Sequence, residues 1–481
     1  MALFAGVWLA TVWTRIGAPL GLNHDGQNAG VFGSSARALV DDPFGSRLGS
    51  HLATHHEVYA NHPPLVNWLL ALAHWLLGDN PAALRLPMVA AAVLLIVATY
   101  RLLSALDLSP GAAAIGTIGG LGAPMFFVYG TMADTPMMGL PFGVLLAGQV
   151  VRLERGRAGR RALVVIAAMC ALAGWEAVLL AVALAIVDAV RVRRGDVVRR
   201  AERRTMSVGR PIAAGLGMGL AVTVGWILWA YDGIAMIRRS FLERSGTTAM
   251  PFSLAESVAV QLRHLADVYG PILAIALGAG VFAVRVPSVR RHLPVLAGVC
   301  LAYQVGFRQG ATYHDYWSYW WQLPIAVAIA GAVEVATRTH RRPQRALVLA
   351  ALVVVACGPL LSLTGRSVVE RSYHDGVAIA RLIDRTRRPP DQTRLVTLGL
   401  GRPNSWASWS THLEVDQVDL GQLHRLAAEH PRWEVIGYCD APRSNGGPPI
   451  CRGLPASTPR ARNVVIAPAA RLDAAIRAAD R

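Results

Sequence analysis

Six ionisable side chains lie where apolar stretches of the sequence end, and their types suit a group-transfer reaction. They are Asp25, His62, Asp134, Glu176, His314 and Asp315. A carboxylate can take the proton of an attacking hydroxyl group, and an imidazole can donate a hydrogen bond to a phosphate. Ionisable groups at the edge of a membrane are costly to bury, so they often mark functional sites. We therefore predict that these residues share one site.

Each of these residues also has a simpler interpretation. Asp25, in the stretch GLNHDGQNAG, could sit in a solvated turn. Asp134 precedes Thr-Pro and could serve only as the N-cap of a helix, and Glu176 could cap the next apolar segment. His314 and Asp315 could form a local pair at an aqueous interface. The sequence leaves these alternatives open.

The composition is that of a membrane protein. The 481 residues are 53% hydrophobic and only 16% charged, with 47 basic against 30 acidic residues and a net charge of +17. All of the basic residues are Arg. A soluble protein has about 25% charged residues. The Arg residues cluster between apolar runs, which is typical of a polytopic membrane protein and argues against a nucleic-acid partner.

About eleven runs approach the length of a membrane-spanning helix, about 20 residues. We predict spans at 2–20, 86–106, 111–130, 136–151, 162–174, 175–190, 211–231, 271–286, 293–307, 320–337 and 346–364. The stretch 162–190 is divided at Gly174 because basic loops flank it on both sides, which demands an even number of passes. Two further apolar stretches, 64–78 and part of 232–270, predict helices lying at the membrane surface.

The Arg counts orient these spans. One set of loops holds 21 Arg, and the opposite set holds eight although it covers more residues. Because Arg is enriched in cytoplasmic loops, the first set is expected in the cytoplasm. The N-terminus would then lie inside, and the long loop 21–85 outside, in a multi-pass protein of the plasma membrane. The six ionisable residues fall on the outer side, although none of them was used to set the orientation.

The last part of the chain is predicted to be a separate domain. Residues 366–481 have no run of membrane length, and short β-like runs alternate there with helical stretches. We predict a small extracytoplasmic α/β domain after a transmembrane domain at 1–365. Cys439 and Cys451 both lie in it, and an oxidising compartment favours a disulfide between them, with two free thiols as the alternative.

Three local patterns resemble the GT-C glycosyltransferases of family 39 type, the protein O-mannosyltransferases and aminoarabinose transferases. The first is His24-Asp25 after the first span. The second is YANHPPL at 59–65, followed by Gly78 and by ALRLP at 83–87. The third is HDYW at 314–317, followed by WQLP at 321–324. The resemblance covers residues 1–365 and implies the α-helical GT-C fold.

The resemblance implies an inverting transfer of a sugar from a polyprenyl monophosphate to an acceptor outside the cytoplasm. It places the catalytic carboxylate at Asp25 and a second acidic residue at Asp134. The usual Asp-Glu pair is Asp25-Gly26 here, so the second carboxylate of that pair is missing. The position that approaches the lipid phosphate is His62, often Lys in the family. Asn61 stands where one branch has a metal-binding Glu, so a divalent metal remains open.

The remaining roles follow from residue chemistry. Arg grips phosphate oxygens through paired donors, so Arg85 joins His62 and His314 as a predicted phosphate ligand. The other polar residues beside these motifs are predicted to bind the substrates: His24, Asn61, Glu176, Asp315 and Tyr316. No nucleotide-binding Gly-rich loop is present, and none is needed for a pre-activated lipid donor.

Several questions stay open at this point. Mannose is favoured, but arabinose-type and other sugars remain, and the acceptor could be protein, lipid or polysaccharide. The rival function is a membrane transporter or lipid flippase, although no internal repeat is seen; a sensor or structural protein is a third. The Ala-, Gly- and Arg-rich composition suggests a bacterial decaprenyl or undecaprenyl carrier. The glycosyltransferase interpretation depends on one geometric prediction, that Asp25, His62 and residues 314–315 share a single outer cleft.

Overall fold

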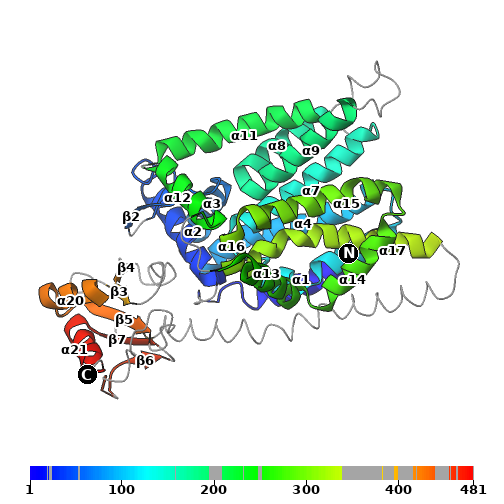
Figure 1. Ribbon diagram of the computed structural model, residues 1–481. Helices are drawn as coiled ribbons and strands as arrows, with labels where there is room; N and C mark the ends of the chain where they lie inside the picture. Colours follow the sequence, from blue (N-terminus) through cyan, green and yellow to red (C-terminus); the bar gives the residue numbers. More distant parts are fainter. Residues whose placement is uncertain are drawn as a thin grey trace.

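The computed structural model is a bundle of helices with a small sheet near its C-terminal end (Figure 1). The structure describes residues 1–18, 20, 24–52, 55–157, 159–193, 208–230, 232–247, 252–338, 382, 395–398, 415–418, 420–438, 454–455, 457–461 and 464–479.

The helices of the bundle are α1 (Ala2–Trp13), α2 (His24–Asp41), α3 (Leu65–Leu77), α4 (Pro81–Ala105), α5 (Pro110–Leu121), α6 (Pro124–Tyr129), α7 (Thr135–Glu154), α8 (Arg160–Ala173), α9 (Trp175–Arg193), α11 (Gly209–Trp229), α12 (Gly233–Ser245), α13 (Leu254–Tyr269), α14 (Pro271–Ala283), α15 (Pro287–Gly306), α16 (Arg308–Tyr313), the 3₁₀ helix η1 (Asp315–Trp321) and α17 (Gln322–Arg338). A short hairpin, β1 (His51–Leu52) and β2 (His55–Val58), lies between α2 and α3.

The bundle is that of a multi-pass membrane protein. Among the described residues, α4, α7, α11 and the stretch formed by η1 and α17 are each long and apolar enough to cross a membrane. Helices α13 and α14 pass the same test together but bend by 98°. Ten of the eleven predicted spans fall on helices of the structure. The eleventh, 346–364, lies outside the described residues.

Small residues let the helices of the bundle approach closely. A Cβ atom on Gly116 or Gly120 of α5 would lie 2.4 to 2.6 Å from an Ala Cβ of α17. Gly215 of α11 packs in the same way on the backbone of α8. Side chains would hold these backbones apart, so the Gly- and Ala-rich composition serves helix packing.

The helix boundaries that matter for the site follow from local sequence. Asp134 caps α7, its side chain accepting a hydrogen bond from the Thr135 backbone N–H, and Pro136 fits the first turn. Gly174 separates α8 from α9, which confirms the predicted division of 162–190. The surface helix expected at 64–78 is α3, and the 232–270 loop contains two helices, α12 and α13.

The long segment between α1 and α4 folds onto the bundle through buried polar groups. The Asn67 amide donates to the Gly49 carbonyl at 2.8 Å, and the indoles of Trp68 and Trp226 both donate to the Leu48 carbonyl. Leu48 has a φ of 56°, in the left-handed region. These bonds hold the turn before β1 against α3 and α11, beside the cavity described below.

The C-terminal elements form an α/β unit with its own apolar core. Its five-stranded sheet has the order β4-β3-β5-β7-β6, in which β3 pairs in parallel with β4 and β5, and β7 pairs antiparallel with β5 and β6. The elements are β3 (Leu395–Leu398), β4 (Val415–Val418), α20 (Leu420–Glu429), β5 (Glu434–Tyr438), β6 (Arg460–Ala461), β7 (Val464–Pro468) and α21 (Ala469–Ala479). Cys439 and Cys451 lie outside the described residues.

Candidate active site

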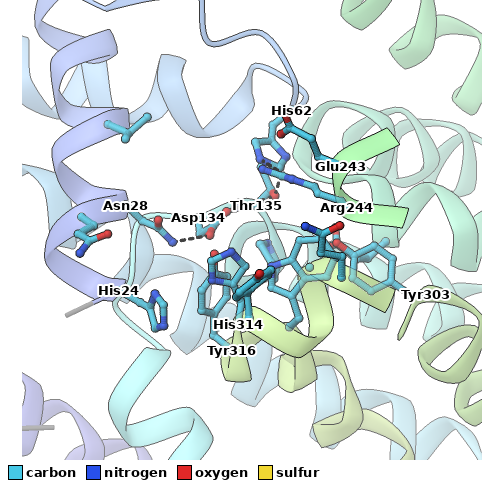
Figure 2. Close-up of a pocket in the computed structure, with 18 of the residues that line it drawn as sticks. His24, Asn28, His62, Asp134, Thr135, Glu243, Arg244, Tyr303, His314 and Tyr316 are labelled. Atoms are coloured by element: carbon cyan, nitrogen blue, oxygen red, sulfur yellow. Dashed lines mark hydrogen bonds between the residues drawn. The ribbon is translucent and has the colours of Figure 1, made fainter. Parts of the chain in front are cut away.

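One polar cavity of about 660 Å³ gathers residues from α2, the segment before α3, and the helices α7, α9, α12, α15, α16 and η1 (Figure 2). Its lining includes His24, Gln27, Asn28, Tyr59, His62, Asp134, Thr135, Glu176, Glu243, Arg244, Tyr303, Gln309, Tyr313, His314, Tyr316 and Trp317. These positions span most of the first 320 residues, so only the tertiary structure creates this site.

The basic end of the cavity is built around Arg244. A guanidinium nitrogen of Arg244 lies 3.3 Å from Nε2 of His62, and the other ring nitrogen of His62 lies 3.4 Å from the Thr135 hydroxyl (Figure 2). The guanidinium also lies over the ring of Trp317, 5.5 Å from its centroid. Arg244 is half-buried and is the single arginine among the described residues that line the cavity.

Asp134 is the carboxylate at the centre of the cavity. One carboxylate oxygen accepts a 2.7 Å hydrogen bond from the Asn28 amide, and the other accepts from the Thr135 backbone (Figure 2). Burial raises the pKa of Asp134 from its ordinary value of 3.8 to about 6, although the Thr135 bond and the Arg244 charge act in the opposite direction. Asp134 is thus both a helix cap and a site residue, so the simpler interpretation was true but incomplete.

The other end of the cavity is lined by rings. The imidazoles of His24 and His314 and the phenol of Tyr316 lie in mutual contact, with centroids 5.1 to 5.2 Å apart. Burial lowers the pKa of His24, against the opposing effect of the Asp315 carboxylate, so this imidazole is neutral near pH 7. We call His24, His314 and Tyr316 the ring cluster.

Glu176 supplies a second buried carboxylate. It lies in the first turn of α9, is 3% exposed and lines the cavity with Tyr303. A Cβ atom on Gly174 would lie 3.1 Å from a Glu176 carboxylate oxygen, so the glycine before α9 leaves room for this side chain.

The prediction of a shared cleft holds for His62 and His314 but was wrong for Asp25. Asp25 is not among the residues that line the cavity; its carboxylate forms an ion pair with Arg85 at 3.4 Å. Successive residues of a helix point about 100° apart, so the α2 orientation that turns His24 to the cavity turns Asp25 away from it.

Three further predicted site residues lie beside the cavity rather than in it. The Arg85 guanidinium donates to the carbonyls of Arg15, Ile16 and Ala18 at the end of α1, in addition to its pairing with Asp25. These bonds occupy its donors, so it is not free to grip a phosphate.

The other two residues have their own partners. The Asn61 amide lies 3.3 Å from the Ser240 hydroxyl, and the Asp315 carboxylate accepts hydrogen bonds from Tyr129 at 2.7 and 2.9 Å. Asp315 therefore lies next to the ring cluster but outside the cavity.

Sequence reasoning missed Arg244, Asn28, Tyr303 and Gln309. Arg244 belongs to a stretch of mixed charge that predicts only a surface helix, and Arg238 and Arg239 of the same helix are exposed. The available signal was the placement of that stretch on the same outer side as His62. Nothing in the sequence separates Arg244 from its two neighbours.

Comparison with known proteins identifies the architecture. Residues 61–200 match the family described as dolichyl-phosphate-mannose-protein mannosyltransferase. The crystal structure of ArnT from Cupriavidus metallidurans bound to undecaprenyl phosphate matches with a TM-score of 0.64 at 15% identity, covering 97% of both chains. The same enzyme in the apo state matches with a TM-score of 0.60 at 14% identity, covering 98% of both. This chain has the fold of the GT-C membrane enzymes.

A third solved structure shares this fold. The Archaeoglobus fulgidus oligosaccharyltransferase tethered with an acceptor peptide matches with a TM-score of 0.56 at 11% identity, covering 91% of this chain and 68% of that one. No curated protein sequence matches the chain.

A resident metal does not fit the residues of the cavity. In the part of the chain that the structure describes, no three His, Cys, Asp or Glu side chains are arranged to hold a metal ion. The residue before His62 is an amide that contacts Ser240, and Asp134 already accepts two hydrogen bonds. We therefore derive no step through a metal.

An apolar groove of about 390 Å³ lies along the start of α7. It is lined from α3, α4 and α7 by Leu69, Leu72, Ala73, Leu76, Leu77, Leu86, Pro87, Ala90, Ala91, Leu94, Met138 and Phe142. Thr135 and Pro136 line the cavity, and Met138 lines the groove. Thr135 and Met138 are three residues apart, which places them on neighbouring faces of α7 about 4.5 Å apart along its axis, so the cavity and the groove approach each other at the start of α7.

Proposed function

We propose that the protein transfers a sugar, with inversion, from a polyprenyl monophosphate donor to an acceptor outside the cytoplasm. The observation that carries the proposal is Arg244, a half-buried guanidinium beside His62, in one cavity with the Asp134 carboxylate. Guanidinium groups bind phosphate oxygens through paired hydrogen bonds, and the charge of the leaving phosphate must be met for the sugar to depart.

The basic end of the cavity would hold the donor phosphate. Arg244 supplies a positive charge there, and His62 offers a ring nitrogen to a phosphate oxygen. Trp317 packs against the guanidinium, which restricts its orientation. The donor phosphate would replace the 3.3 Å contact between Arg244 and His62, and their nitrogen atoms would move apart to receive its oxygens.

Asp134 is the proposed general base. An inverting transfer needs a single carboxylate that takes the proton of the acceptor hydroxyl as the oxygen attacks the anomeric carbon. Asn28 and the Thr135 backbone fix the Asp134 carboxylate in place. A carboxylate with a pKa of about 6 is ionised at neutral pH and is a better proton acceptor than one with a pKa of 3.8.

The apolar groove gives the polyprenyl chain a place beside the reaction. It is lined almost wholly by aliphatic side chains, with one aromatic residue, Phe142, and Leu72, Leu76 and Leu77 at its side are 50 to 63% exposed. The match to ArnT bound to undecaprenyl phosphate supports a lipid of this class. We propose that the chain lies along α3 while the phosphate reaches Arg244.

The identity of the sugar is a narrower proposal. The family that matches residues 61–200 is described by mannose transfer, so mannose is the first donor to test and an arabinose-type sugar the second. The proposed carrier is decaprenyl or undecaprenyl phosphate. The Arg distribution supports a plasma-membrane protein with a cytoplasmic N-terminus and the C-terminal α/β unit outside.

The test is a transfer assay in membranes that contain the full chain. Wild type should transfer label from decaprenyl-phosphate-[³H]mannose, or from the matching arabinose donor, and Arg244→Ala should reduce the rate about 10²- to 10³-fold, as loss of a charge-stabilising donor does. Arg239→Ala, an exposed arginine of the same helix, is the matched control. Full activity of Arg244→Ala would overturn the phosphate site, and flipping of donor without transfer would favour a flippase.

A further inference from the structure

The two ends of the cavity differ in charge. The charged residues that line it are Asp134, Glu176, Glu243 and Arg244; Glu243 and Arg244 lie beside His62, and Asp134 lies between them and the ring cluster (Figure 2). Tyr313, which adjoins His314 in the chain, is uncharged and also lines the cavity. If the donor phosphate occupies the basic end, the ring end is left for the second substrate.

Aromatic rings continue from the ring cluster to the surface. Tyr313 lines the cavity but is 48% exposed, and its ring contacts that of Phe252 at 5.6 Å. The next residue, His314, stacks over Trp317 at 6.1 Å. The Phe252–Tyr313 pair and the ring cluster follow one another through the adjacent residues Tyr313 and His314, and we call these five rings the aromatic track.

The polar atoms along this track suit hydroxyl groups. A neutral imidazole, an amide and a phenol each offer a donor and an acceptor, as a hydroxyl group does. Gln309 also lines the cavity, and its side-chain oxygen is buried without a hydrogen-bond partner among the described residues. Buried acceptors are normally hydrogen-bonded, so this oxygen can accept a hydrogen bond from a bound ligand.

The electrostatics argue against a charged ligand here. The groups that face His24 are Asp315, His264, His314 and Tyr316. No Arg is among the described residues of the track, and the Asp315 carboxylate behind it disfavours an anion. The Asp315 carboxylate already accepts hydrogen bonds from the Tyr129 hydroxyl, which weakens its attraction for a cation.

We propose that the aromatic track binds the acceptor and that the acceptor is a neutral saccharide chain. Pyranose and furanose rings present apolar C–H faces to aromatic rings and hydroxyl groups to neutral donors and acceptors. The terminal sugar lies at the ring cluster, where its hydroxyl reaches Asp134, and preceding sugars pass Tyr313 toward the surface. This rests on the proposed function, because it assigns the second substrate of the same reaction.

The first test identifies the labelled product. Membranes with wild-type protein are incubated with decaprenyl-phosphate-[³H]mannose, and the product is treated with proteinase K and extracted with organic solvent. Label in protease-resistant saccharide material is expected. Label that proteinase K releases as small peptides would overturn the saccharide acceptor while leaving the donor site intact.

The second test measures binding directly and does not need turnover. Saturation-transfer NMR on the full chain in nanodiscs should show contact with mannotriose or arabinotriose and none with a Ser/Thr-containing peptide. Tyr313→Ala should weaken binding about tenfold, the loss of one aromatic contact, and Tyr313→Phe should retain it. Phe44→Ala, another exposed aromatic residue, is the control and should bind as wild type does.

The outcomes separate the two proposals. No oligosaccharide binding, or an unchanged affinity in Tyr313→Ala, overturns the aromatic track as an acceptor site even if sugar is transferred. Oligosaccharide binding that depends on Tyr313, in a protein that transfers neither donor sugar, supports the track and counts against the proposed donor.

Discussion

Two arginines on the same predicted side of the membrane have opposite surroundings. Arg85 is 4% exposed, and its guanidinium is enclosed by three backbone carbonyls of the α1 end and by Asp25. Arg244 is half-buried, faces a cavity and contacts an imidazole and an indole. A cation whose donors are already used stabilises the fold, whereas one whose charge is left partly unmet is prepared for an anionic ligand.

The same contrast separates the two aspartates. The Asp25 carboxylate is paired with Arg85 outside the cavity, and the Asp134 carboxylate lies inside it. This contrast supports the proposal that Asp25, a residue of the sequence motif, positions the site and that Asp134, far along the chain, carries the chemistry. Four predictions test the contrast, and each can be measured in the full-length protein.

The largest effect is expected from Asp134→Asn. Removing the proposed base should lower the transfer rate about 10²- to 10⁴-fold, while the amide keeps the size of the side chain. The measurement is label transfer from decaprenyl-phosphate-[³H]mannose in membranes, normalised to the amount of folded protein. A variant that retained more than a tenth of the wild-type rate would remove Asp134 from the mechanism.

Arg85→Leu is expected to lower the stability of the folded protein. Breaking a buried ion pair by removing one partner costs about 3–5 kcal/mol, because the remaining charge and the carbonyls lose their partner. The thermal midpoint in detergent should fall clearly below that of the wild type. Arg244→Leu serves as the counterpart and should lower transfer with a much smaller change in the midpoint; equal destabilisation by both variants would contradict the distinction between the two arginines.

The pH dependence of transfer tests the state of Asp134. Because its pKa is raised to about 6, the carboxylate is ionised above pH 6 and protonated below it. The rate of a base-catalysed step should therefore fall about tenfold per pH unit below pH 6. A rate–pH profile of wild type against Asp134→Asn checks this, since the residual rate of the variant should lack that acidic limb.

The smallest effect is expected from Asp25→Asn. The variant loses a charge-assisted interaction of about 1.5–3 kcal/mol but keeps a polar group beside Arg85, so transfer should decline only a few-fold through a slight shift of α2. Transfer rates and thermal midpoints of Asp25→Asn and Asp25→Ala provide the measurement. A loss as large as that of Asp134→Asn, in protein of wild-type stability, would return the catalytic role to Asp25.

Much of the architecture could be predicted from the sequence because it depends on local patterns. Apolar length located the helices, Gly174 marked the break between α8 and α9, and the residues before Pro136 gave the cap of α7. The strands predicted in the C-terminal part are confirmed where the structure describes them, at β3, β5 and β7. Each of these features arises within a few residues of the chain.

The individual site residues depend on longer-range information. The patterns placed His62, Asp134, Glu176 and His314 on one side of the membrane, and the structure gathers all four in one cavity. These patterns could not show which of His24 and Asp25 faces the cavity, because the two residues are adjacent in sequence and about 100° apart around the helix. Their orientation is set by the packing of α2 against α3 and by the Asp25–Arg85 pair between α2 and α4.

The sequence alone was enough to locate most helices, to predict that the ionisable groups gather at one face of the membrane, and to reveal motifs that resemble a lipid-dependent glycosyltransferase. The tertiary structure decided which cation faces the cavity. Arg238, Arg239 and Arg244 belong to one short helix, and only the packing of α12 against α16 brings the last of them to His62. Composition and residue spacing predict the structure of a single segment, whereas the partner of a side chain depends on how the segments pack together.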